Sequence, residues 1–166
     1  MSLFYFDQLK LFDNLTPAQN VIVRQLFFPV EECAGAMLFN QGDPANYLYI
    51  VVNGEVLIHY KPDDGPLLTV ARIKPEGVVG WSAALGSPNY TSSAICSTDC
   101  QLLRISSEDL RDLCERYPET GAQVLERLAI VIAERMRNTH VHVMALLEQG
   151  LRIGINKPVE AAQLST

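Results

Sequence analysis

Residues 47–60 read YLYIVVNGEVLIHY, and this stretch decides the fold class. Asn53-Gly54 divides two runs of Val, Ile, Leu and Tyr, residue types that are common in strands. Because Asn-Gly accepts the positive φ angles of a type I′ turn, we expect a β-hairpin here. Gly, Pro, Asn and Asp keep recurring between short β-prone runs from residue 30 to residue 105. This spacing predicts a mainly β fold, either a barrel or a sandwich.

Turn signals place further strands on both sides of this hairpin. The segment DDGP at residues 63–66 predicts a second turn, between a strand that ends near Tyr60 and another at 67–73. The last strand is expected at 101–105.

Helices are predicted to flank the β region. The segment TPAQ at residues 16–19 has a capping Thr, a Pro suited to the first turn and a Gln that can complete a capping box. The helix that it starts is expected to reach about Phe27. A second short helix is capped by Ser106 or Ser107 and ends before Pro118.

A long helix is predicted from about Glu119 to Gln149. Its apolar residues are spaced 4, 3, 4, 3, 4 and 3, as in a coiled-coil seam. About 30 helical residues span about 45 Å, more than a small barrel covers, so we expect the seam to form a homodimer. The alternative is that the stripe packs on its own barrel. The seam consists of Leu125, Ala129, Ile132, Met136, Thr139, Val143 and Leu146.

These elements predict one domain in three segments. Residues 1–118 hold an N-terminal helix, the β region and a short helix, and residues 119–150 hold the long helix. Gly150 and Pro158 are expected to end regular structure, which leaves 151–166 as a tail.

Composition excludes several functional classes. The 166 residues carry a net charge of −6, which argues against a nucleic-acid surface. The N-terminus has no secretion-signal pattern and no apolar run approaches the roughly 18 residues of a membrane span, so we expect a cytoplasmic protein. The four cysteines are scattered, which predicts no metal site, and no nucleophile or carboxylate motif predicts an enzyme.

Several motifs together resemble the cyclic-nucleotide-binding domain family, which includes the catabolite activator and the regulatory subunits of protein kinase A. The motifs are NQGD at 40–43, YLYI at 47–50, NGEV at 53–56, IKPEG at 73–77 leading to Val79-Gly80, and DCQLLRI at 99–105. The resemblance covers nearly the whole chain. It implies an antiparallel, jelly-roll-like β-roll with flanking helices, a ligand inside the roll, and a role as a regulatory sensor in signal transduction.

The resemblance also locates a phosphate-binding cassette, which in the family reads Gly-Glu-x-Ala-Leu with an Arg nine residues after the Glu. The Arg binds the cyclic phosphate by charge-assisted hydrogen bonds, and the Glu accepts from the ribose 2′-hydroxyl. Aligned without a gap, Trp81 replaces the Glu and Tyr90 replaces the Arg. The ligand-binding residues implied are Gly80, Trp81, Ser82, Ala83, Tyr90, Thr91 and Ser92.

The long helix carries one more implied ligand contact. The segment AERMRNT at 133–139 matches the helix motif of the catabolite activator whose Thr contacts the adenine, so the resemblance places Thr139 at a base. Because Thr139 also lies on the seam, a polar position in a dimer core is the alternative.

Loss of the cassette charges makes a standard cyclic nucleotide a poor ligand. Removing one partner of a buried charge pair costs about 2–5 kcal/mol, or roughly 30- to 4000-fold in affinity. Arg72 and Lys74 lie outside the cassette. We expect a sensor of a cyclic nucleotide or another small molecule that acts on a protein effector. A ligand-free interaction scaffold, plugged by Trp81 and Tyr90, and the sensor part of a transcription regulator are the alternatives.

Overall fold

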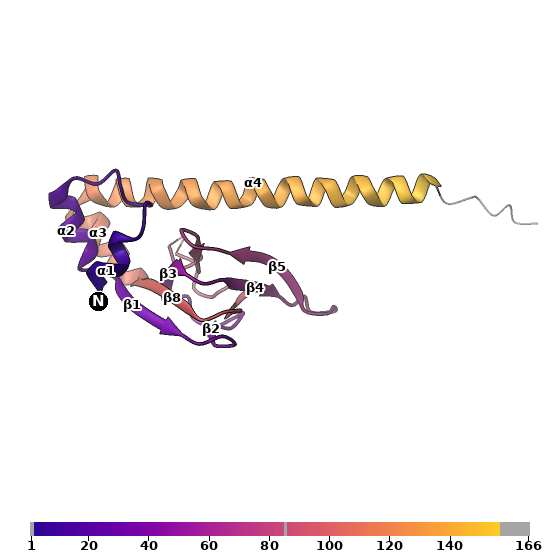
Figure 1. Ribbon diagram of the computed structural model, residues 1–166, viewed down its shortest axis with the longest axis horizontal. Helices are drawn as coiled ribbons and strands as arrows, with labels where there is room; N and C mark the ends of the chain where they lie inside the picture. Colours follow the sequence, from indigo (N-terminus) through magenta and orange to yellow (C-terminus); the bar gives the residue numbers. More distant parts are fainter. Residues whose placement is uncertain (1, 85, 157–166) are drawn as a thin grey trace, which may run out of the picture. The chain divides into compact units, whose positions relative to one another are not determined.

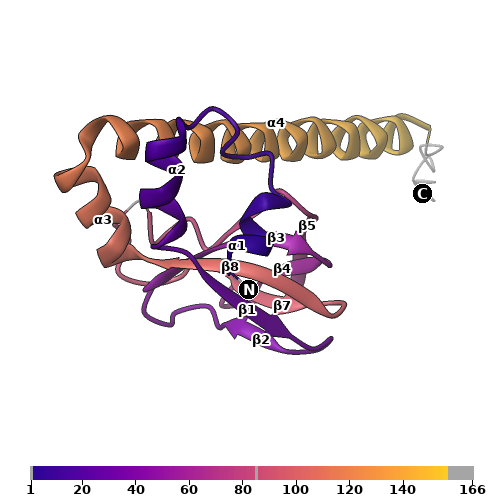
Figure 2. The same ribbon diagram turned by 60° about the vertical axis from the view of Figure 1, so that its left-hand side comes forward.

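The computed structural model describes residues 2–84 and 86–156, and Figures 1 and 2 show its ribbon from two sides. The helices are α1 (Ser2–Asp7), α2 (Pro17–Arg24), α3 (Ser107–Arg116) and α4 (Pro118–Asn156). The strands are β1 (Phe28–Glu32), β2 (Met37–Phe39), β3 (Tyr47–Asn53), β4 (Val56–Tyr60), β5 (Leu68–Ile73), β6 (Val78–Val79), β7 (Ser93–Cys96) and β8 (Cys100–Ser106). The predicted mainly β fold with flanking helices is confirmed.

The strands of the described residues form two antiparallel sheets that face each other. One sheet has the order β1-β8-β3-β6, and the other has the order β2-β7-β4-β5. The chain passes from one sheet to the other at every connection between described strands except that between β4 and β5, which gives a jelly-roll-like β-roll.

The turn at Asn53-Gly54 is present, but the hairpin predicted around it is wrong. Gly54 has a φ of 94°, as the turn requires. β3 pairs with β6 and β8, whereas β4 pairs with β5 and β7. The Asn-Gly turn therefore carries the chain across the roll, because each strand finds its partners in a different sheet. The hairpin between β4 and β5, around the second predicted turn, does form.

Two apolar clusters hold the roll and its helices together. The inner core lies between the sheets, and the outer core lies between the sheet containing β8 and the helices. The inner core includes Phe39, Tyr49, Val51, Val56, Ile58, Ile73, Val79, Ala83, Tyr90, Ala94, Cys96 and Leu102. The outer core includes Tyr5, Phe6, Phe12, Val23, Phe27, Leu48, Ile50, Leu103, Ile105, Leu110, Leu113, Val124 and Leu128.

The helix caps are those that the sequence predicts. The side chain of Thr16 accepts from the backbone N–H of Gln19, and the Gln19 side chain accepts in return from the backbone N–H of Thr16, which completes the capping box. Ser106 caps α3 by accepting from the N–H of Asp109. Figure 2 shows α1, α2 and α3 on the side of the roll formed by β1, β8 and β3.

Helix α4 is longer than predicted. It continues through Gly150 to Asn156, so residues 151–156 are helical and not part of a tail. A glycine inside a helix costs only about 1 kcal/mol, and the first proline downstream is Pro158. The remaining predicted tail, residues 157–166, lies outside the described residues.

The chain divides into two units at Ile132. The first unit holds the roll, α1 to α3 and the start of α4. The second unit begins at Ala133 and contains the rest of α4. No helix in the described part of the chain combines the length and apolarity needed to cross a bilayer.

Candidate functional site

The cassette segment begins at Gly80, directly after β6. Gly80 has a φ of 78°, which glycine adopts readily. A Cβ at this position would lie 2.9 Å from the Tyr47 carbonyl oxygen and 3.2 Å from ring carbons of Phe39 and Tyr90. Both the backbone conformation and the space therefore require glycine.

The segment after Gly80 is a short turn that its own backbone holds in shape. Ala83 is buried in the inner core, whereas Trp81 and Ala84 pack against the outer core. The turn thus lies between the two cores. Its hydrogen bonds run from Ala83 N to Gly80 O (3.1 Å), from Ala84 N to Trp81 O (3.0 Å) and from Ser87 N to Ser82 O (3.0 Å).

Tyr90, at the position of the family's arginine, is buried and fully engaged. Its ring stacks on Phe39 with centroids 3.6 Å apart and an interplanar angle of 12°. Its hydroxyl donates to the Tyr47 carbonyl oxygen at 2.6 Å and accepts from the Tyr47 N–H at 3.0 Å. Burial raises the pKa of the phenol to about 12. The group that replaces the phosphate-binding arginine is therefore neutral and bound to the protein's own backbone.

The backbone of Tyr90 is also fixed, by the turn that follows β2. Its carbonyl accepts from the N–H of Gly42 at 2.8 Å, and its N–H donates to the carbonyl of Asp43 at 2.9 Å. The side-chain amide of Asn89 donates to the Gly42 carbonyl at 2.7 Å. Movement of Tyr90 out of the roll would break these bonds together with those of its hydroxyl.

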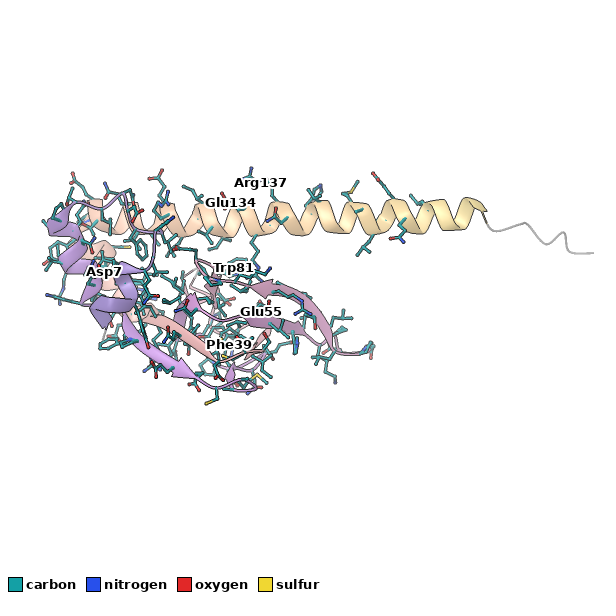
Figure 3. The ribbon with its side chains drawn as sticks, viewed as in Figure 1. Asp7, Phe39, Glu55, Trp81, Glu134 and Arg137 are labelled. Carbon is teal, nitrogen blue, oxygen red and sulfur yellow. The ribbon has the colours of Figure 1, made fainter. Side chains whose placement is uncertain are left out.

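Trp81, at the position of the family's glutamate, does not fill the roll. It is half-buried and packs outward against the outer core. Figure 3 labels Phe39 among the strands and Trp81 apart from it. Of the two replaced residues, Tyr90 is the one that lies in the inner core.

The hydroxyl groups of the cassette are less engaged than Tyr90. Thr91 is exposed, and Ser82 and Ser92 are half-buried. Their hydroxyls make no hydrogen bond within the described part of the chain. These groups remain available to a ligand.

The residues predicted on α4 fall on both units. Leu125 is 39% exposed, Met136 59% and Leu146 54%. Ala129 is exposed and Ile132 is half-buried. Thr139 and Val143 lie in the helix, but their side chains lie outside the described residues. The base contact of Thr139 and the dimer seam therefore stay predictions.

One cation on the inner side of the roll was not singled out from the sequence. Arg104 follows Leu102 by two positions on β8 and so shares its face. Its guanidinium lies 4.5 Å from the centroid of the Tyr47 ring, and its Nε is buried without a hydrogen-bond partner in the described residues. Because side chains alternate along a strand, the spacing from Leu102 would have indicated that Arg104 faces the inside of the roll. Arg72, in contrast, pairs with Glu55 at 3.1 Å.

A cavity of about 290 Å³ borders the outer side of the cassette turn. Ala83 and Ala84 form one wall, α3 contributes Leu110 and Cys114, and α4 contributes Leu125. The cavity thus separates the cassette turn from parts of α3 and α4.

Comparison with known proteins agrees with this geometry. The family model of the cyclic nucleotide-binding domain matches residues 29–117, more than half of the chain. A CRP-like cAMP-activated global transcriptional regulator from Mycobacterium tuberculosis is 26% identical over 137 residues, which cover 82% of this chain and 59% of that protein. The cyclic AMP receptor protein of Thermus thermophilus is 28% identical over 133 residues, 80% of this chain and 60% of that protein.

The fold is shared with solved structures. A cyclic nucleotide-binding domain from Methylobacillus flagellatus superposes with a TM-score of 0.79 at 19% identity, over 85% of this chain and 83% of that one. The chain spans about three fifths of the length of the two curated relatives. The likeness therefore concerns the roll and the helices that follow it.

Proposed function

The chain belongs to the cyclic nucleotide-binding domain family, and from that premise we propose that it is a regulatory domain whose cassette is occupied by its own Tyr90. One observation carries this proposal. The Tyr90 hydroxyl both donates to and accepts from the Tyr47 backbone, and the Tyr90 ring stacks on Phe39. A cyclic phosphate would meet a neutral phenol in place of a guanidinium.

The energetic consequence is a weak or absent response to cyclic nucleotides. An arginine supplies charge-assisted hydrogen bonds, which are roughly twice as strong as neutral ones. Tyr90 is neutral and its hydroxyl already donates to the Tyr47 carbonyl, and displacing it would leave the Tyr47 N–H and carbonyl without their partner. Each buried polar group left unpaired costs about 1–3 kcal/mol. The domain would then act as a non-enzymatic, cytoplasmic module that binds other proteins.

A second candidate is a sensor of a different small molecule. The free hydroxyls of Ser82, Thr91 and Ser92 and the half-buried ring of Trp81 favour it. Such a ligand would use neutral hydrogen bonds and ring stacking in place of a charge pair.

The output of the domain would be α4, and its partner a second copy of the chain. Leu125, Met136 and Leu146 expose large apolar surfaces along the predicted seam. Pairing of two α4 helices on this seam would cover them. A protein effector that reads the helix pair is part of the same proposal.

Trp81 fluorescence separates the two candidates, because the chain has one tryptophan and it lies in the cassette turn. A closed domain should show an emission that cyclic AMP and cyclic GMP leave unchanged. A saturable shift with either nucleotide would contradict the closed cassette. A shift produced only by a chemically different metabolite would support the second candidate.

A further inference from the structure

The segment at Lys10 and Leu11 connects the turn before the cassette to α4. The carboxylate of Glu76 accepts from the N–H of Lys10 at 2.7 Å through Oε1 and from the N–H of Leu11 at 3.1 Å through Oε2. On the other side, the carbonyl of Leu11 accepts from Nε of Arg127 at 2.8 Å. The backbone of Leu11 is thus hydrogen-bonded both to the turn before the cassette and to α4.

The Glu76 end of this connection is held in an unfavourable backbone conformation. Among the described residues, Glu76 is the one non-glycine residue with a positive φ, 74°. Such a conformation is uncommon for residues with a Cβ. Its own N–H donates to the Val51 carbonyl at 2.9 Å, which ties the turn to β3. The two bonds made by the carboxylate give a physical reason why a glutamate stands in this turn.

The Arg127 end lies on the part of α4 that packs against the roll. Val124 and Leu128, on either side of it, are buried in the outer core. Leu11, whose N–H and carbonyl group make the two bonds, is buried, with an exposed fraction of 3%. A carboxylate on one side and a guanidinium on the other make both hydrogen bonds charge-assisted.

We propose that Glu76, the Leu11 backbone and Arg127 form a polar relay that transmits movement of the cassette to the first half of α4. Glu76 lies two positions before the two-residue strand β6 and Gly80 directly follows that strand, so a displacement of the cassette would be passed along β6 to Glu76. Movement of Glu76 would displace the Leu11 backbone, which is bonded to its carboxylate, and Leu11 would in turn displace Arg127. The regulatory use of the relay rests on the proposed function, whereas its three hydrogen bonds are features of the structure itself.

Hydrogen exchange of the full chain, without ligand, tests the relay. Glu76→Gln keeps the side-chain shape but removes the charge and one acceptor oxygen. We expect amide exchange to become about tenfold faster at residues 120–132 as well as at Lys10 and Leu11, because loss of a charge-assisted hydrogen bond makes local opening easier. Glu55→Gln is the matched control, because it breaks the Arg72 ion pair on the other sheet. It should leave exchange in α4 unchanged.

The reciprocal variant completes the test. Arg127→Gln should speed exchange at residues 74–79, because coupling between two ends is reciprocal. If Glu76→Gln changes only Lys10 and Leu11 and leaves 120–132 within twofold of the wild type, the relay is overturned. If Glu76→Gln does not fold, unchanged exchange at 74–79 in Arg127→Gln overturns it equally. Cyclic nucleotide binding, which would defeat the proposed function, has no bearing on either result.

Discussion

Tyr90 replaces the arginine of the family's cassette and is also part of the inner core. It stacks on Phe39, bonds Tyr47 through its hydroxyl, and is held by its backbone to the turn after β2. A residue with so many native partners stabilises the roll. The same partners make Tyr90 costly to displace, so a ligand that entered the cassette would have to break contacts that stabilise the roll.

Removal of the Tyr90 hydroxyl should therefore destabilise the fold. Tyr90→Phe keeps the stacked ring but leaves the Tyr47 N–H and carbonyl unpaired, which should lower the free energy of unfolding by about 1–3 kcal/mol for each group. Urea denaturation followed by circular dichroism measures this. Tyr60→Phe is the control, since Tyr60 is 41% exposed and should change stability by less than about 0.5 kcal/mol. Equal effects of the two substitutions would contradict the role assigned to Tyr90.

Alkaline pH should weaken the fold through buried acids that are neutral in the native state. Burial raises the pKa of Tyr90 from 10.0 to about 12 and that of Cys96 from 9.0 to about 12. Because the unfolded chain deprotonates first, this stability is fully present below about pH 9 and is lost as the pH rises through about 12. Unfolding free energies from about pH 8 to about pH 11 should fall, and fall less steeply in Cys96→Ala. A flat profile in the wild type would contradict the burial of these groups.

At the scale of elements, α3 and α4 pack closely where α4 begins. Gly121 faces Cys114, and a Cβ on Gly121 would lie 2.7 Å from the Cys114 Cα and 2.9 Å from its Sγ. Glycine thus allows the start of α4 to approach α3, next to the cavity behind the cassette turn.

Two glycines of the same helix should respond in opposite directions to alanine. Gly121→Ala should lower the free energy of unfolding by about 1–3 kcal/mol, because overpacking against α3 outweighs the gain in helix propensity. Gly150→Ala meets no atom within 4 Å, and it should leave stability unchanged or raise it by up to about 1 kcal/mol. Thermal unfolding of both variants measures the contrast. Stabilisation by Gly121→Ala would contradict the close approach of α3 and α4.

Local signals predicted the elements better than their partners. The caps at Thr16 and Ser106 and the β4–β5 turn are short-range features, and they were predicted. Asn53-Gly54 predicted a turn but not that its two strands would pair in different sheets. The bonds of Tyr90 to Tyr47 and of Glu76 to Leu11 join residues far apart in the sequence, so no local pattern could indicate them.

At the scale of the whole molecule, the exposed seam on α4 predicts a dimer. Met136→Glu places a charge on the seam and should shift the chain toward monomer, because a buried unpaired charge costs several kcal/mol. Ala145→Glu adds the same charge at an exposed position off the seam and should leave the assembly unchanged. Sedimentation equilibrium measures the mass of each. A monomeric wild type, or dissociation by both variants alike, would contradict the seam.

The central claim is that Tyr90 closes the cassette to cyclic nucleotides, and calorimetric titration of the dialysed protein with cyclic AMP and cyclic GMP tests it most directly. Loss of a buried charge partner costs about 2–5 kcal/mol, which would move a micromolar site toward the millimolar range. The account predicts no saturable binding heat for the wild type below millimolar nucleotide. A dissociation constant in the micromolar range or tighter would contradict it, and would turn attention to Arg104 as the cation that holds the phosphate.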